Sequence, residues 1–119
     1  MLSELLKDEG YEVFTADSAE AALPLLRTTD LDLVLTDMKM PGMDGIEFLK
    51  KIKEFDAELP VILITAYAEV ERAVEAMHLG AFTYLAKPFS NRQLLANAAK
   101  AIEHYSLALE VRRLKQEVS

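Results

Sequence analysis

The sequence has no cysteine and no long hydrophobic run. Without cysteine the chain can form neither a disulfide bond nor a thiolate metal site, which fits a cytoplasmic protein. The longest apolar run, 60–64 with its flanks, has the length of a strand and is too short to cross a bilayer. No secretory signal is recognisable either. We therefore expect a cytoplasmic protein without a membrane partner.

Positive charge is also scarce. The sequence has 13 lysines and arginines against 20 aspartates and glutamates, which gives a net charge of −7. Such a chain repels the phosphate backbone of nucleic acid, so no direct nucleic-acid partner is expected. The one dense basic group, Arg112, Arg113 and Lys115, is typical of a solvated helix face. The length of 119 residues, with 51% hydrophobic and 28% charged residues, is typical of one globular domain.

What is present is a regular alternation of strand-like and helix-like segments. Strands are predicted where β-branched, aromatic and apolar residues cluster, at 11–17, 31–37, 60–66 and 81–88. Helices are predicted where apolar residues recur every three or four positions, at 1–9, 17–26, 44–52, 70–77 and from 90 onward. Because parallel strands need crossover connections, this order predicts an α/β fold with a parallel sheet and helices on both faces.

Capping residues mark several predicted helix boundaries. A side chain that can cap a helix precedes Glu or Gln by three positions in three pairs: Asp17 with Glu20, Asp44 with Glu47, and Ser90 with Gln93. Gly10 and Gly80 are expected to end helices, and Pro24 to kink or loosen one. For Asp44, the capping role is favoured over a role as a ligand.

Three chemically useful side chains stand at the carboxyl ends of successive predicted strands: Asp37, Thr65 and Lys87. In open parallel α/β sheets the functional site lies at this edge. Each residue alone is weak evidence, but an acid, a hydroxyl and a cation on one edge favour phosphoryl transfer to a carboxylate. Asp37 would be the nucleophile, while Lys87 and Thr65 would stabilise the transferred group. The loop after Asp37 leaves room for Mg²⁺, which prefers oxygen ligands.

The motifs "TDMKMPGMDG", "ITAY" and "YLAKPF" together resemble the receiver domain of bacterial two-component response regulators. The resemblance implies a flavodoxin-like fold and a signalling module rather than a metabolic enzyme. It makes Asp37 the acceptor of a phosphoryl group from a sensor histidine kinase, and Lys87 the phosphate-binding lysine. Thr65 and Tyr84 would be the switch pair that controls a downstream output domain.

The same resemblance implies two features of the backbone. The peptide bond between Lys87 and Pro88 should be cis, and the carbonyl of Lys39 should be a ligand of Mg²⁺ beside Asp37. The C-terminal part resembles the linker of NtrC-type, sigma-54-dependent transcription activators, so the output is expected to be transcription activation.

Receiver domains begin with a central strand that ends in two acidic metal ligands, and this sequence opens directly in the first helix. We therefore expect an altered sheet order or assembly, and doubtful Mg²⁺ binding and phosphorylation in this chain. In a flavodoxin-like order the absent strand would lie between the first two predicted here. Its loss would leave unpaired apolar edges on 11–17 and 31–37, which recruit other chains.

The C-terminal helix carries two apolar stripes. The first, Leu95, Ala98, Ile102, Tyr105 and Leu109, is expected to face the core. The second, Leu107, Val111, Leu114 and Val118, has the spacing of a helix-pairing surface. These patterns predict a domain over 1–106 with a helical extension over 107–119, and self-association as a two-fold dimer.

Two other functions fit parts of the pattern. A dimerisation fragment without phosphate chemistry would explain the missing acidic pair. A phosphatase of the haloacid-dehalogenase type would also use an aspartate at a strand end, but its motif has a second aspartate where this sequence has Lys39.

Overall fold

The computed structural model describes residues 2–66 and 69–118. Five helices lie within these residues: α1 (Leu2–Asp8), α2 (Ala19–Thr28), α3 (Gly45–Phe55), α4 (Val70–His78) and α5 (Asn91–Val118). Three strands alternate with them, namely β1 (Val34–Asp37), β2 (Val61–Ala66) and β3 (Thr83–Lys87). The strands form one parallel sheet in the order β1-β2-β3, as expected from the alternation of elements.

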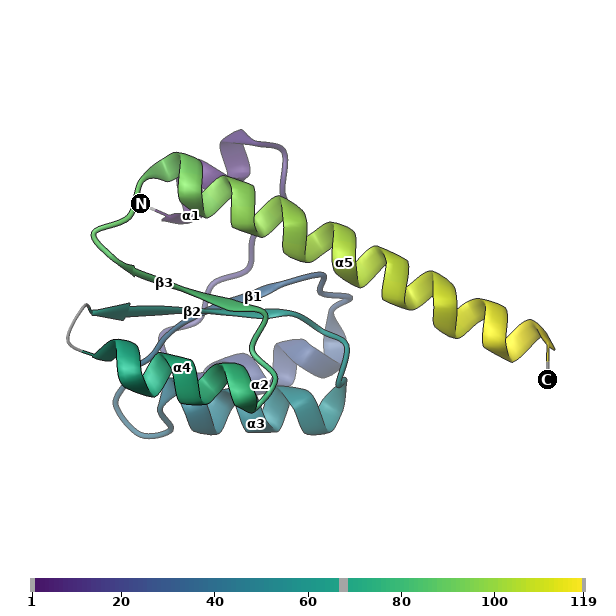
Figure 1. Cartoon of the computed structure of the whole chain (residues 1–119), viewed down its shortest axis with the longest axis horizontal. Helices are drawn as coiled ribbons and strands as arrows, with labels where there is room; N and C mark the ends of the chain where they lie inside the picture. The colour runs from purple at the N-terminus through teal and green to yellow at the C-terminus, as the bar shows by residue number, and fades with distance from the viewer. Residues whose placement is uncertain (1, 67–68, 119) are drawn as a thin grey trace.

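Helices cover both faces of the sheet (Figure 1): α1 and α5 lie on one face, and α2, α3 and α4 on the other. The core is divided in the same way. One buried cluster packs under α2, α3 and α4 and includes Leu49, Ile52 and Leu63, whereas the other joins Ile62 and Leu85 to Leu94 and Ala101 of α5. Because β2 is the central strand, Val61–Ile64 is buried on both sides.

The predicted strand at 11–17 is not formed, since 11–16 runs without strand structure between α1 and α2. Its β-branched and aromatic residues favour extended backbone, but a strand needs a partner for its hydrogen bonds, and β1 is not paired with it. The three strands that form keep their sequential order. The change that we expected in the sheet is therefore the failure of 11–16 to pair. β1 is consequently an edge strand, and Val34 and Leu35 are only partly buried.

The caps agree with the sequence at two of three helices. Asp44 accepts the Glu47 amide at 2.9 Å, and Ser90 and Gln93 form a reciprocal pair at 3.0 Å each. At α2 the prediction is wrong by one residue, because Ser18 rather than Asp17 is the N-cap and accepts the Ala21 amide. Backbone dihedrals at Gly10 and Gly80, φ 94° and 107°, fit their places after α1 and α4. α2 runs through Pro24 without a break.

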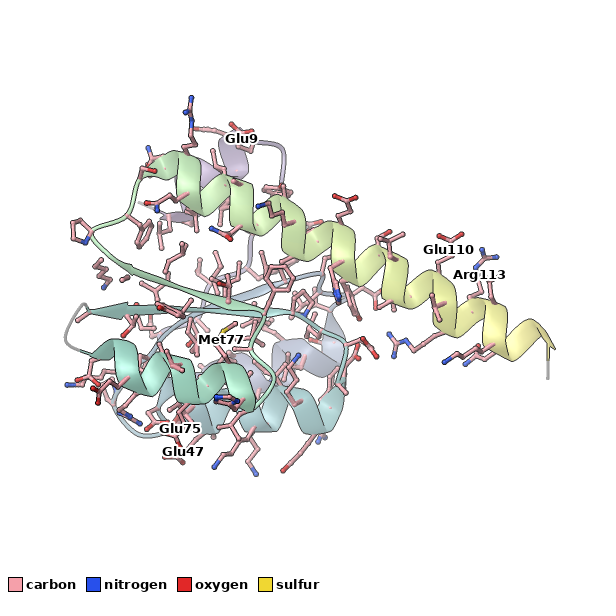
Figure 2. The ribbon with its side chains drawn as sticks, viewed as in Figure 1. Glu9, Glu47, Glu75, Met77, Glu110 and Arg113 are labelled. Carbon is pink, nitrogen blue, oxygen red and sulfur yellow. The ribbon has the colours of Figure 1, made fainter. Side chains whose placement is uncertain are left out.

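α5 presents two surfaces, as predicted, although the inner stripe differs in detail. Its buried residues are Leu94, Ala98, Ala101 and Tyr105, while Leu109 is 38% exposed. Leu94 and Ala101 escaped the prediction because a helix that packs broadly on a sheet buries more than one narrow row of positions. Leu107, Val111 and Leu114 are 47–57% exposed. Figure 2 shows this part of the helix projecting from the domain, with Glu110 and Arg113 directed away from the core.

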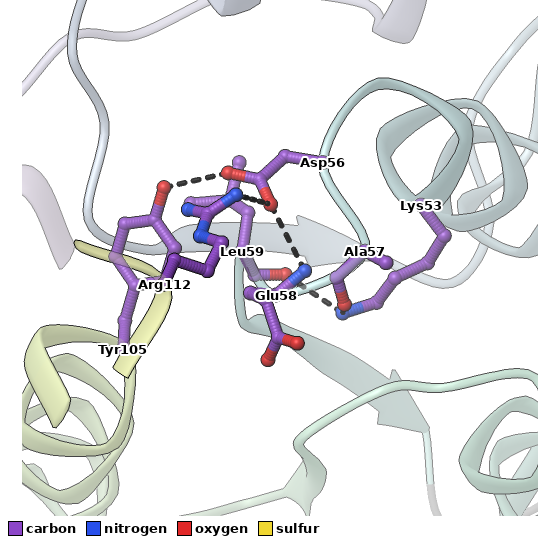
Figure 3. Close-up of polar contacts among 7 residues, drawn as sticks. All are labelled: Lys53, Asp56, Ala57, Glu58, Leu59, Tyr105 and Arg112. Carbon is purple, nitrogen blue, oxygen red and sulfur yellow. Dashed lines mark hydrogen bonds and ion pairs between the residues drawn. The ribbon is translucent and has the colours of Figure 1, made fainter. Parts of the chain in front are cut away.

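A polar cluster anchors α5 to the loop between α3 and β2 (Figure 3). The Tyr105 hydroxyl donates to Asp56 Oδ2 at 2.6 Å, and Arg112 Nη1 lies 3.5 Å from Asp56 Oδ1. These contacts are seven residues apart on α5, which is about two turns. From the last turn of α3, Lys53 Nζ donates to the carbonyl oxygens of Ala57 and Leu59 in the same loop. One carboxylate therefore fixes both the position and the direction of α5 where it leaves the domain.

Candidate functional site

The parallel register brings the predicted site residues to one edge of the sheet. Asp37 ends β1, Lys87 ends β3, and Thr65 is the penultimate residue of the central strand β2. Asp37 pairs with Ile64, and Ala66 pairs with Lys87, so the three residues lie on neighbouring strands at nearly the same level. Strand length and register thus supply the rigid framework of the site.

Asp37 and Lys87 are brought together, with Lys87 Nζ 3.7 Å from Asp37 Oδ1. Both side chains remain about half exposed, at 54% for Asp37 and 59% for Lys87. The carboxylate is therefore accessible to a reactant, and a fixed cation stands beside the position that a new anionic group on it would occupy. The Lys87–Pro88 peptide is cis, as the motif implied.

Thr65 and Tyr84 lie one and three residues before the ends of β2 and β3. Thr65 is only 1% exposed, and its hydroxyl donates to the carbonyl of Ala66 at 3.1 Å. Tyr84 is partly buried and packs against the core cluster under α2, α3 and α4.

The loop after Asp37 is held tightly against the strand. Gly42 has φ 77°, a left-handed conformation that favours glycine. A Cβ at Gly45 would lie 2.4 Å from the Asp37 carbonyl oxygen, and the Gly45 amide donates to the Met38 carbonyl at 2.8 Å. The start of α3 can therefore approach the end of β1 this closely only with glycine at position 45. Asp44 then caps α3, and the Glu47 amide chiefly accounts for its lowered pKa.

Two ion pairs across this edge were not predicted from the sequence. Lys39 Nζ lies 2.8 Å from Glu69 Oε1, and Arg72 Nη2 lies 3.2 Å from Asp44 Oδ2. Both connect the segment after β1 with the start of α4, where Glu69 is the N-cap and Arg72 lies in the first turn. No local spacing could have indicated them, because each joins residues about 30 positions apart that only the sheet brings together.

The residues at this edge do not by themselves make a side-chain metal site. Among the described residues, no group of three His, Cys, Asp or Glu side chains could hold an ion. Asp37 supplies one carboxylate, and the side chain of Lys39 is engaged with Glu69. Three side-chain ligands are therefore not gathered around Asp37 in the described residues, whereas Mg²⁺ can be held by one or two carboxylates together with waters.

Residues 1–99 match the response regulator receiver domain family. The chain belongs to this family. As a receiver domain it is 43% identical over 119 residues to the regulatory protein AtoC of Escherichia coli strain K12, a match that covers all of this chain and 26% of AtoC. It is 41% identical over 105 residues to the DNA-binding transcriptional regulator NtrC of Klebsiella pneumoniae, covering 88% of this chain and 22% of NtrC.

Solved receiver domains have the same fold. A receiver domain protein from Clostridium thermocellum superimposes with a TM-score of 0.85 at 35% identity, over 90% of this chain and 86% of that one. The fold is therefore the flavodoxin-like receiver fold with NtrC-type relatives, as the motifs predicted. The chain spans about a quarter of the length of these full-length regulators. No helix in the described part of this receiver domain has both the length and the apolar character needed to cross a bilayer.

Proposed function

We propose that this receiver domain accepts a phosphoryl group on Asp37 from the phosphohistidine of a sensor histidine kinase. The observation that carries the proposal is the accessible Asp37 carboxylate with Lys87 Nζ 3.7 Å away at the end of β3, across the central strand β2. A signalling role follows, since the chain would store a phosphoryl group rather than convert a metabolite.

The transfer would be a displacement at phosphorus. A carboxylate oxygen of Asp37 attacks, the phosphorus–nitrogen bond of the donor breaks, and its electron pair returns to the imidazole, which takes up a proton. Lys87 would neutralise charge on the phosphoryl oxygens. Mg²⁺, where it takes part, would be held by Asp37 and the Lys39 carbonyl together with waters, and it would neutralise charge on the phosphoryl oxygens.

We also propose that Thr65 and Tyr84 form the switch. A phosphoryl group on Asp37 would offer the Thr65 hydroxyl a charged acceptor in place of the Ala66 carbonyl, and Tyr84 would move into the space that Thr65 vacates. The changed surface around Tyr84 would control an output domain, with α5 beyond residue 106 as the connector. A ligand shifts such an equilibrium only by its different contacts in the two states.

Labelling with acetyl phosphate tests the acceptor. After incubation with Mg²⁺, intact-mass analysis should show one added phosphoryl group on the wild-type chain and none on Asp37→Asn. Lys87→Ala should lower the labelling rate by about 100-fold, as for loss of one charge-stabilising group. Asp30→Asn is the matched control, because Asp30 is an exposed acid that precedes β1 and so lies at the opposite edge of the sheet. An unlabelled wild-type chain, or a labelled Asp37→Asn chain, would reject the proposal.

Self-association is a second proposed property. The exposed stripe of Leu107, Val111 and Leu114 on α5 favours pairing with the same helix of another copy, which would make the chain a homodimer.

A further inference from the structure

The loop between α3 and β2 holds one carboxylate in a fixed position beside α5 (Figure 3). Asp56 Oδ1 accepts the Glu58 amide at 3.0 Å, so this side chain is tied to its own loop. Lys53 Nζ closes the same loop by donating to the carbonyl oxygens of Ala57 and Leu59, at 3.2 Å and 2.8 Å. These contacts position Asp56 without any help from α5, and they present α5 with a preformed anion.

Two side chains of α5 reach this anion with unequal strength. The Tyr105 hydroxyl lies 2.6 Å from Asp56 Oδ2, and Tyr105 is buried. Arg112 Nη1 lies 3.5 Å from Asp56 Oδ1, and the Arg112 side chain is 45% exposed. A short hydrogen bond in a buried position persists, whereas a long ion pair in contact with water is weak and opens readily. The contact of Tyr105 is therefore permanent in the folded domain, and that of Arg112 is not.

The part of α5 after Tyr105 needs a contact of this kind. Tyr105 is the last residue of the helix that belongs to either buried core cluster. Helical segments shorter than about 12–15 residues are marginal in water when nothing packs against them, and 106–118 is of that length. The Arg112–Asp56 pair joins this segment to the domain two turns beyond Tyr105.

The pair also fixes which side of the helix faces outward. At 3.6 residues per turn, Arg112 lies within about 20° of Tyr105 around the helix, so both face the domain. Leu107 and Leu114 lie about 200° and about 180° from Tyr105 and therefore face away from it. Both leucines are about half exposed. While Arg112 contacts Asp56, the apolar stripe stays turned toward solvent.

From these observations we propose that the Arg112–Asp56 pair is a releasable catch on α5. When the catch is closed, α5 leaves the domain as a rigid arm with the apolar stripe turned outward. When it is open, the domain orders α5 only as far as Tyr105, and the arm beyond it frays and swings. This conformational device rests neither on phosphoryl chemistry at Asp37 nor on pairing of the stripe with another copy.

A distance measurement within one chain tests the catch. Because the sequence contains no cysteine, spin labels can be attached through the exposed positions of a Lys50→Cys, Leu114→Cys chain, on α3 and α5. An excess of unlabelled chain restricts pulsed electron paramagnetic resonance to distances within one copy. Arg112→Gln should widen the distance distribution about twofold, because the segment after Tyr105 loses its tie to the domain. An unchanged width would overturn the proposal.

Hydrogen exchange in the unlabelled chain gives a second readout. Arg112→Gln should speed exchange of the amides at 113–116 about fivefold, as for loss of one partly exposed ion pair. Lys115→Gln is the matched control, because it removes the same charge from an exposed side chain nearer the end of α5, where a cation favours the helix at least as much. Glutamine has nearly the helix propensity of both residues. Equal effects of the two substitutions would assign the change to helix electrostatics and reject the catch.

A double-variant comparison shows whether the two residues act on each other. Asp56→Asn keeps an oxygen that can accept from Tyr105 and from the Glu58 amide but removes the charge that Arg112 needs. It should widen the distance distribution as much as Arg112→Gln does, and the double variant should be no wider than either single variant. Effects that add in the double variant would show that Arg112 and Asp56 act separately, and the proposed catch would be wrong.

Discussion

Tyr105 places its hydroxyl against the Asp56 carboxylate in a mostly buried position, with the side chain only 7% exposed. We predict that Tyr105→Phe lowers the free energy of unfolding by about 1–3 kcal/mol, because a hydrogen bond to a charged group is lost from a partly desolvated carboxylate. Urea unfolding at neutral pH would measure the change. Tyr11→Phe is the control, since it removes the same atom from a partly exposed side chain, and equal effects of the two substitutions would contradict the prediction.

The same pair predicts how stability depends on pH. Burial, followed by the hydrogen bond to Asp56, raises the pKa of Tyr105 from 10.0 to about 12. The neutral phenol is therefore favoured in the folded state, and its contribution is complete below pH 10.0 and lost as the pH rises toward about 12. The difference in unfolding free energy between wild type and Tyr105→Phe should shrink over that range. A constant difference would contradict this linkage.

At acidic pH, Asp56 makes stability depend on pH in the opposite direction, because folding lowers its pKa whereas it raises that of Tyr105. Burial alone would raise its pKa, but hydrogen bonds from Tyr105 and the Glu58 amide and the charge of Arg112 outweigh burial, so the pKa is lowered below 3.8. The anchor is therefore intact above this pH and weakens as the pH falls below it.

At the scale of elements, the position of α3 depends on Gly45. A Cβ there would lie 2.4 Å from the Asp37 carbonyl oxygen, and backbone cannot yield as a flexible side chain can. We predict that Gly45→Ala destabilises the fold by about 1–3 kcal/mol, the usual cost of overpacking. The sign of this stability change tests the close contact, because alanine in a helix is otherwise favoured over glycine by about 1 kcal/mol. A stability in urea that is unchanged or increased would show that α3 tolerates a shift away from β1.

The elements also show how far the sequence can be interpreted. Periodicity and capping patterns located all five helices, and three of the four predicted strands form. The fourth, 11–17, was wrong because strand propensity describes a residue's preference, whereas a strand exists only with a partner. The strand-end positions of Asp37 and Lys87 were predicted correctly, because strand ends are visible in sequence. Glu69, Arg72 and Asp56 were not found as contact residues, because their partners are distant in sequence and the tertiary fold alone brings them together.

At the scale of the whole molecule, α5 extends the domain to 47 Å along its longest axis and carries apolar residues into solvent. Leu107, Val111 and Leu114 are 57%, 49% and 47% exposed, and they follow one another at four- and three-residue spacing. That spacing puts them on one side of the helix, opposite a core stripe that is already covered. The extension therefore offers a surface that a second copy can bury.

We predict that the chain is a dimer at micromolar concentration and that Leu114→Glu dissociates it, because a carboxylate in the centre of an apolar helix pair is strongly disfavoured. Sedimentation equilibrium measures the association. Ser106→Glu is the control, since it adds the same charge at an exposed position of the same helix that the stripe does not include. If Leu114→Glu leaves the dimer intact, α5 is not the interface, and the unpaired edge of β1 would be the surface through which the copies associate. A wild-type chain that remains monomeric would exclude both surfaces as routes to self-association.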